Sequence, residues 1–240
     1  MAKKLIVVLG ITGAQGGSVA ETFRTLPNWT VRGVTHDPSN PKAAALRDQG
    51  VEIVTGDVDN IASLPNAFKG ANVIFGLTDF WSPFHDPVTY TRLAQGQTIN
   101  EYCYDLELQR GLNIAKAAAT TIATIDHFII SVLSYAKEWS KGKYTWVYHF
   151  DSKAEAARRI QKDYAELAAR MSLLQVDDMD KAIPGGLGKE LGEMCAYMAE
   201  FGYDGLDPTV VRPADLEVDC PTTSIEDYIK SEDWSPVFKS

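Results

Sequence analysis

Apolar positions in the first 130 residues fall in short runs, separated by turns and by segments with helical spacing. The first run, Leu5–Leu9, is apolar throughout, as in a parallel strand that is buried on both faces. Later runs predict strands at 31–35, 51–55, 73–77 and 127–132. Helical spacing between the strands predicts helices at 41–49 and 61–68, the second capped by Asn60, and a longer one ending near residue 119. This alternation predicts an α/β fold with a Rossmann-type, doubly wound parallel sheet and helices on both faces.

Beyond residue 151 the pattern changes. An amphipathic helix is predicted over 154–168, a sixth strand over 172–176 and a further helix over 190–201. A polar, glycine-containing stretch separates the last two. We therefore predict a dinucleotide-binding domain over residues 1–176 and a reduced, helical C-terminal lobe over 177–240.

A glycine loop follows the first strand, with Gly10, Gly13 and Gly16 in the spacing G-x-x-G-x-x-G. In that order the glycines permit a tight turn, close approach of a phosphate and close packing of the next helix. The N-terminus of that helix favours an anion. Its buried face is predicted at Val19, Phe23 and Leu26. The loop therefore predicts dinucleotide binding, and the alternative is a turn that only connects a strand to a helix.

Composition narrows the function classes. The chain has 240 residues, 45% of them hydrophobic, which suits one globular domain with or without a small lobe. No apolar stretch is long enough to span a bilayer, and the first strand starts too early for a signal peptide. Three widely spaced cysteines favour a reduced, cytoplasmic setting.

The net charge of −9, without a basic stripe, argues against direct binding of nucleic acid but is compatible with a protein partner. The four histidines lack the spacing of metal ligands, so no metal site is expected.

The choice of cofactor depends on the residues after the second strand. Asp37 lies roughly 20 residues past the glycine loop, where an acid bonds a ribose 2′-hydroxyl and favours NAD. His36 and Lys42 could instead meet a 2′-phosphate, and a plain Asp-Pro turn is the third alternative. We predict NADP, with NAD left open. Asp57, after the third strand, either bonds the adenine amino group or starts a helix.

Candidate catalytic residues are His149 and Lys153, which are four apart and share one helix face. Short-chain dehydrogenases/reductases carry Tyr-x-x-x-Lys at this spacing, where the lysine bonds the nicotinamide ribose and lowers the pKa of the tyrosine. Lys153 is predicted to bind the ribose, whereas His149 either exchanges a proton or is structural. Ser131 either orients a carbonyl or satisfies a backbone group. The aromatic loop at 80–84 either packs on the sheet or forms a lid.

Together these residues resemble the NmrA-like proteins, an atypical branch of the short-chain dehydrogenases/reductases, and especially the fungal members. The matching stretches are 8–20, 31–38, 56–59, 77–81 and 149–153. The resemblance implies dinucleotide contacts at Gly10, Thr12, Gly13, Gln15 and Gly16. It also implies adenine contacts around Asp57 and nicotinamide-side contacts at Thr78 and Lys153.

The chain departs from the family pattern in three places. His36 stands where members commonly have Arg, and Ile130-Ser131-Val132 stands where many have Trp-Ser-Ser. After residue 176 the chain passes almost directly to 180–184, which matches a region well downstream. This gap predicts an internal deletion that removes part of the substrate wall and spares the cofactor half.

Two functions follow from the resemblance. The first is a reductase that moves a hydride between NADP(H) and a small carbonyl or enone, with His149 or water handling the proton. The second is a non-catalytic redox sensor that binds the dinucleotide and regulates transcription by contact with a protein partner, in the cytoplasm or the nucleus.

Overall fold

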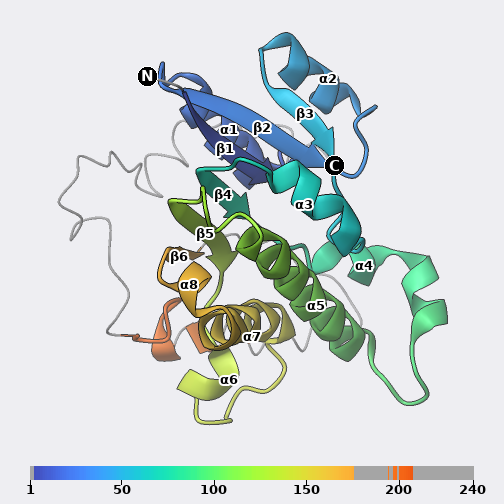
Figure 1. The fold of residues 1–240 in the computed structure, drawn as a ribbon. Helices are drawn as coiled ribbons and strands as arrows, with labels where there is room; N and C mark the ends of the chain where they lie inside the picture. Colours follow the sequence, from blue (N-terminus) through green and yellow to red (C-terminus); the bar gives the residue numbers. More distant parts are fainter. Residues whose placement is uncertain (1–2, 176–193, 195–196, 199, 208–240) are drawn as a thin grey trace, which may run out of the picture. The chain divides into compact units, whose positions relative to one another are not determined.

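The computed structural model describes residues 3–175, 194, 197–198 and 200–207. Six parallel strands form one sheet in the order β3-β2-β1-β4-β5-β6 (Figure 1). They are β1 (Lys4–Leu9), β2 (Trp29–Thr35), β3 (Glu52–Thr55), β4 (Val73–Gly76), β5 (His127–Val132) and β6 (Met171–Gln175). This strand order is that of a dinucleotide-binding Rossmann sheet, so the predicted fold class is confirmed.

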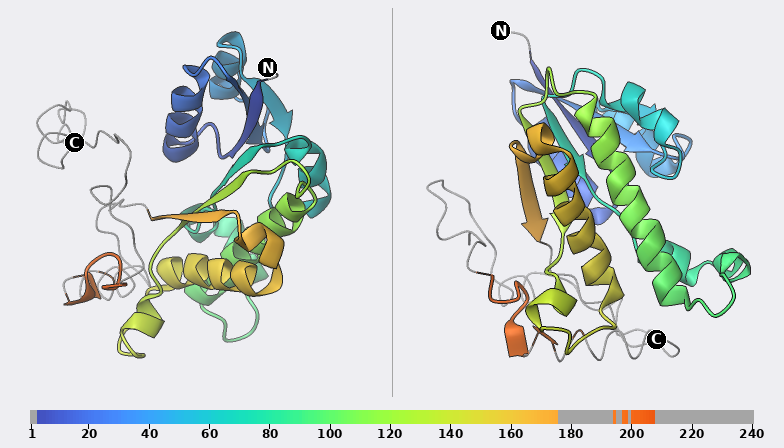
Figure 2. Two further views of the ribbon diagram at one scale, coloured as in Figure 1. Left: turned by 60° about the vertical axis from the view of Figure 1, so that its left-hand side comes forward. Right: turned by 60° about the horizontal axis from the view of Figure 1, so that its bottom comes forward.

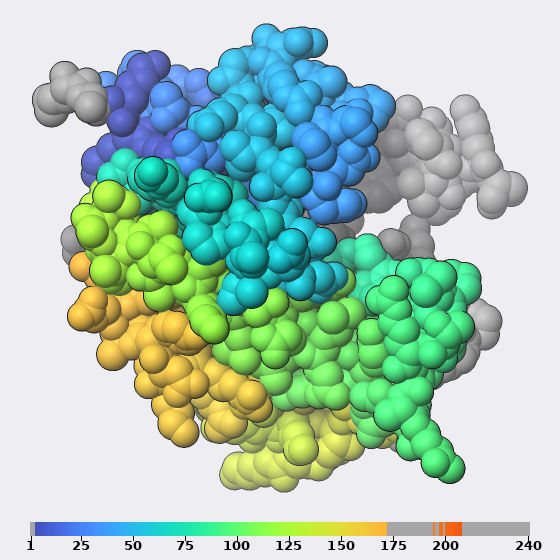
Figure 3. Space-filling view, turned by 45° about the vertical axis from the view of Figure 1, so that its right-hand side comes forward, coloured from blue at the N-terminus to red at the C-terminus, as the bar shows by residue number. Residues whose placement is uncertain are grey.

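Helices cover both faces of this sheet (Figure 2). They are α1 (Ala14–Arg24), α2 (Pro41–Asp48), α3 (Leu64–Phe68), α4 (Trp81–His85), α5 (Ile99–Ala119), α6 (Ala136–Trp139), α7 (Tyr148–Asp163) and α8 (Ala165–Ala168), with 3-10 turns η1 (Ile61–Ser63) and η2 (Pro87–Arg92). The segment that joins α4 to α5 projects from the body of the molecule (Figure 3) and exposes about half of Val88 and of Tyr90.

The first strand is apolar throughout because it faces two cores. Successive side chains of a strand point to opposite faces. Val7 and Leu9 join one cluster with α3, α5 and α7, whereas Ile6 and Val8 join a second cluster with α1. None of the four exposes more than 2% of its surface. The double burial explains why the run lacks the polar alternation of a half-exposed strand.

The first helix is shorter than the sequence predicts. Val19 and Phe23 pack against the second core cluster, as expected. Leu26 lies beyond the end of α1 and is 41% exposed, so its predicted place on the buried face is wrong. Pro27 follows it, and a residue before proline is disfavoured in helical geometry.

The predicted helix over 61–68 is divided in two. The 3-10 turn η1 precedes α3, and Asn60 makes no side-chain capping bond, so its predicted capping role is wrong. Pro65 stands in the first turn of α3, where its missing N–H costs nothing and its fixed φ starts a new helix.

The predicted helix over 154–168 has different bounds. It begins earlier, at Tyr148, and ends at Asp163, because Tyr164 leaves helical geometry at φ −129°. The Tyr164 ring packs partly buried against the first core cluster, and the separate helix α8 follows. The sixth strand is confirmed, one residue earlier than predicted.

Contacts divide the chain into two units, residues 1–206 and 207–240, and all the described residues except Asp207 belong to the first. Within the predicted helix over 190–201, residues 194, 197–198 and 200–201 are helical. Met194 and Tyr197 pack with Val147 and Phe150. The predicted boundary and deletion at residue 176 lie outside the described residues. In the part of the chain that the structure describes, no helix has the length and apolar character of a membrane span.

Candidate functional site

The predicted site residues share one edge of the sheet. Because the six strands are parallel, their carboxyl ends meet at the same edge. Gly10 follows β1, His36 follows β2, Asp57 follows β3 and Thr78 follows β4. The chain reverses direction across the sheet between β1 and β4, which is where such folds bind ligands.

The glycine loop forms a tight turn that leaves no room for a side chain at Gly10 or Gly16. Gly10 has φ +60°, and the Gly13 amide donates to the Gly10 carbonyl at 2.9 Å. A Cβ on Gly16 would lie 2.4 Å from that same carbonyl oxygen. Gly13, the N-cap of α1, has no side chain, and among the described residues no side-chain capping bond is made to the first amides of α1. The resulting cradle of main-chain amides fits an anion.

Thr12 and Gln15 flank this turn and are half-buried. Gly13 between them is exposed. The five residues that the resemblance implies for the dinucleotide are therefore together in space.

The segment after β2 forms a turn. The Asp37 carboxylate accepts hydrogen bonds from the Ser39 amide at 2.9 Å and the Ser39 hydroxyl at 2.5 Å. The hydroxyl bond, followed by the amide bond, holds the pKa of Asp37 below its ordinary value. Asp37 therefore forms the Asp-Pro turn that was one of the three interpretations of this segment. His36 and Lys42, the candidates for a 2′-phosphate, are exposed.

Asp57 organises the loop after β3. Its carboxylate accepts the Asp59 amide at 2.8 Å, and its own amide donates to the Ser63 hydroxyl at 2.9 Å. The side chain is half-buried, and the contacts are those of a turn that leads into η1. Among the described residues, the Asp57 carboxylate bonds no amide of η1, whose N-cap is Asn60, so both the helix-start role and the adenine contact stay predictions.

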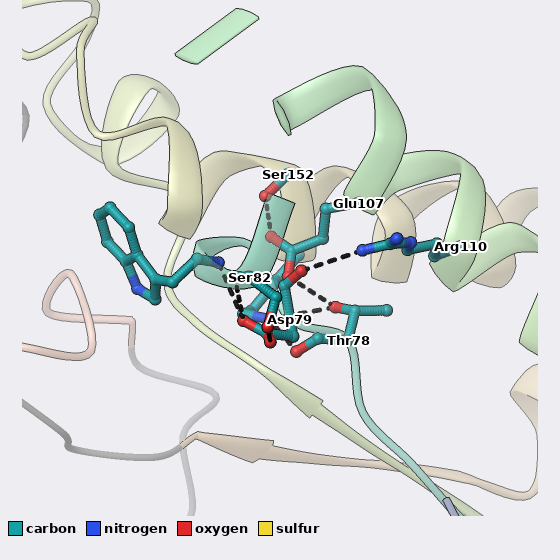
Figure 4. Close-up of polar contacts among 8 residues, drawn as sticks. Thr78, Asp79, Ser82, Glu107, Arg110 and Ser152 are labelled. Atoms are coloured by element: carbon teal, nitrogen blue, oxygen red, sulfur yellow. Dashed lines mark hydrogen bonds and ion pairs between the residues drawn. The ribbon is translucent and has the colours of Figure 1, made fainter. Parts of the chain in front are cut away.

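Lys153 belongs to a buried polar network whose other members, Thr78, Glu107 and Ser152, are labelled in Figure 4. Its ammonium donates to Glu107 at 2.5 Å, to the Thr78 carbonyl at 2.8 Å and to the Thr78 hydroxyl at 3.0 Å. Glu107 also accepts the Thr78 hydroxyl at 2.8 Å and the Ser152 hydroxyl at 2.5 Å. An ammonium has three donors, so these contacts use all of them inside the protein.

Glu107 is the residue that sequence reasoning missed. Its side chain is 1% exposed and that of Lys153 is 14% exposed, so the pair is a buried ion pair. Its signal in the sequence is a charged residue on a buried helical stripe with Cys103, Gly111 and Ile114. A charge on such a stripe requires a partner, which indicates a network without naming its members.

His149 lies among aromatic rings. Its ring centroid is 4.9 Å from Trp81, 5.9 Å from Phe80 and 4.8 Å from Phe150, and the residue is 6% exposed. The predicted aromatic loop contains the short helix α4, which starts where the Asp79 carboxylate accepts the Trp81 amide at 2.9 Å. Phe80 is buried, which fits the packed alternative better than a lid.

Ser131 lies one residue before the end of β5 and is 7% exposed. The structure brings it to the same sheet edge without assigning it a role. Among the described residues, no group of three or more His, Cys, Asp or Glu side chains is arranged to hold a metal ion.

Comparison with known families agrees with this geometry. The model of the NmrA-like family matches residues 2–168. The chain belongs to the NmrA-like family. The match includes every predicted site residue, from Gly10 to Lys153.

Several fungal relatives are named NmrA-like family domain-containing oxidoreductases. The protein hkm9 of Aspergillus hancockii is 31% identical over 140 residues, covering 58% of this chain and 37% of hkm9. The protein himF of Aspergillus japonicus is 30% identical over 152 residues, covering 63% of this chain and 40% of himF. The matches thus span two-fifths or less of these NmrA-like relatives.

Solved structures of NmrA, a negative transcriptional regulator, share the fold. The complexes of NmrA with NADP and with NAD each give a TM-score of 0.55 at 20% identity. Each match covers 73% of this NmrA-like chain and 45% of the other.

Proposed function

We propose that this NmrA-like chain binds NADP(H), with NAD as a second ligand, and acts as an oxidoreductase on a small carbonyl or enone. The observation that carries the proposal is the glycine cradle between β1 and α1. A Cβ on Gly16 would clash with the Gly10 carbonyl, and α1 begins with amides that lack a side-chain cap. The naming of fungal relatives as oxidoreductases, and the NADP complex of NmrA, support the same function.

The residues present fit a dinucleotide along the sheet edge. The amides at Gly13 and the start of α1 would hold the pyrophosphate. The Asp57 loop would face the adenine and Thr78 the nicotinamide side, with His36 placed to meet a 2′-phosphate. The cofactor, when bound, supplies the hydride.

Lys153 enters this function as a paired cation. Its contacts with Glu107 and Thr78 fix the carbonyl at the end of β4 against α7. A ribose hydroxyl would therefore accept a hydrogen bond from the Lys153 ammonium, in competition with Thr78. The proton of the reaction would come from His149 or from water, with Ser131 available to orient the carbonyl.

Calorimetric titration with NADPH, NADP⁺, NADH and NAD⁺ tests binding. We expect heat of binding with NADPH and NADP⁺, and weaker heat with NADH and NAD⁺. If none of the four dinucleotides gives heat, the proposal is contradicted. Gly13→Asp and Gly13→Asn are matched variants, since both residues cap helices well. The aspartate should weaken binding far more than the asparagine, because its charge repels the pyrophosphate.

A second function is favoured by the surroundings of His149. The aromatic packing at this position, where reductases carry tyrosine, suits a non-catalytic redox sensor that regulates transcription through a protein partner. Such a sensor would work in the cytoplasm and the nucleus. It should discriminate NADPH from NADP⁺ and leave a panel of carbonyls and enones unreduced. If the wild type reduces any compound of the panel and Lys153→Met abolishes that activity, the sensor function is excluded.

A further inference from the structure

One face of α5 carries three polar side chains that reach the ligand edge of the sheet. Glu107, Arg110 and Asn113 are spaced three apart, so they lie one above the other. Glu107 bonds the Thr78 hydroxyl, and the Asn113 amide donates to the Val58 carbonyl at 2.8 Å. Arg110 lies between them and contacts both loops.

The Arg110 guanidinium makes three hydrogen bonds. Two run in parallel to the Asp59 carboxylate, each at 2.7 Å. The third reaches the Asp79 carbonyl at 3.2 Å, and Figure 4 shows Arg110 directed at Asp79. The Arg110 side chain is 15% exposed, and its bond to Asp59 holds the pKa of that carboxyl below its ordinary value. The pair is therefore charged at neutral pH. A planar fork suits two parallel bonds, which a lysine cannot reproduce.

Both loops that Arg110 holds contain predicted cofactor contacts. The Asp59 amide donates to the Asp57 carboxylate, so fixing Asp59 also fixes the adenine-side residue. Asp79 follows Thr78, the nicotinamide-side residue, and its carboxylate accepts the first amides of α4. One side chain thus joins the loop after β3 to the loop after β4.

We propose that Arg110 is a positioning residue that sets the spacing between the adenine-side and nicotinamide-side walls of the dinucleotide groove. This role rests on the proposed function. A dinucleotide engages both walls through one linker, so its affinity depends on their separation. A ligand that engages only the adenine side depends on that separation much less.

The test compares NADPH with ADP by calorimetry in Arg110→Lys, Arg110→Met and the control Arg24→Met. Arg24 forms a surface pair with Glu21 at the far end of α1. We expect Arg110→Met to weaken NADPH binding roughly tenfold and ADP binding by no more than about threefold. Arg110→Lys keeps a cation for Asp59 without the fork, so it should bind ADP like the wild type and NADPH more weakly. Arg24→Met should bind both normally.

Each other outcome has a distinct meaning. Wild-type protein that binds no nucleotide overturns the proposed function and this role with it. The positioning role alone is overturned if the wild type binds NADPH but both Arg110 variants bind NADPH and ADP as the wild type does. It is also overturned if both variants lose affinity for NADPH and ADP equally. If Arg110→Met does not fold, Asp59→Asn takes its place, because Asp59 is 48% exposed and the change conserves its volume. The same excess loss of NADPH over ADP is then expected.

Discussion

Gly16 and Gly17 are neighbours in α1, yet the structure leaves very different space around them. A Cβ on Gly16 would lie 2.4 Å from the Gly10 carbonyl oxygen, whereas the nearest atom to one on Gly17 is 3.5 Å away. Gly16→Ala should lower the free energy of unfolding by about 1–3 kcal/mol through overpacking. Gly17→Ala should raise it by about 0.5–1 kcal/mol through helix propensity. Urea denaturation of both variants measures the difference, and equal effects would contradict the close contact.

Lys153 and Glu107 give a second prediction at the residue scale. Lys153→Met leaves the Glu107 carboxylate buried without its cation, since that side chain is 1% exposed. Breaking a buried pair in this way costs about 3–5 kcal/mol of unfolding free energy. Adding Glu107→Gln should recover a large part of the loss, because the unpaired charge is removed. If the double variant is no more stable than Lys153→Met in urea, the ion pair is not what stabilises this network.

Single residues were predictable where their signal is local. Gly10, Gly13 and Gly16 lie within seven positions and share one role, so their spacing was informative. Glu107 and Arg110 were missed because their partners are 46 and 51 positions away. Those contacts form only when the crossover connections place α5 beside the loops after β3 and β4.

At the scale of elements, the N-terminus of α5 is closed by a capping box. The Thr98 hydroxyl accepts the Glu101 amide at 3.2 Å, and the Glu101 carboxylate accepts the Thr98 amide at 2.8 Å. Thr98→Ala should lower the free energy of unfolding by about 1 kcal/mol at neutral pH.

The pH dependence of this cap has a definite sign. The bond from the Thr98 amide, then that from its hydroxyl, lowers the pKa of Glu101 below its unfolded value. The stabilisation is therefore present above the unfolded pKa and is lost as the pH falls through the folded one. The cost of Thr98→Ala should shrink in acid, with Thr22→Ala in the exposed part of α1 as control. A cost that is constant with pH would contradict the bond that the Thr98 hydroxyl donates to the Glu101 carboxylate.

Strands were predicted more accurately than helix ends. The central strands β1 and β4 are short, largely buried apolar runs, so their signal is local in the sequence. Helix ends depended on neighbours outside the periodic pattern, as at Leu26 before Pro27. The end of α7 at Tyr164 depends on the packing of the Tyr164 ring against the core, and no local sequence pattern indicates that contact.

At the scale of the molecule, binding and stability are linked. A ligand that binds only the folded state adds about 2.7 kcal/mol of stability at 100 times its Kd. NADPH should therefore raise the melting temperature progressively with its concentration, and Gly13→Asp should abolish the shift. Thermal melts at several NADPH concentrations measure this effect. A melting temperature that stays constant for the wild type would contradict binding.

The fold class could be predicted, because alternating strands and helices permit few arrangements of a parallel sheet. That topology alone brings Gly10, His36, Asp57 and Thr78 to one edge. The topology does not specify the chemistry at this edge. Lys153 on α7 is paired with Glu107 on α5, and only the packing of these two helices brings the pair together.

The contact between Trp81 and His149 gives this edge an optical signal of its own. The two ring centroids are 4.9 Å apart, so the emission of the indole is sensitive to changes at this edge. With the other tryptophans, Trp29, Trp139, Trp146 and Trp234, changed to phenylalanine, the fluorescence of the chain would come from this ring alone. Its intensity would then report the arrival of a nicotinamide on the same edge, without any added label.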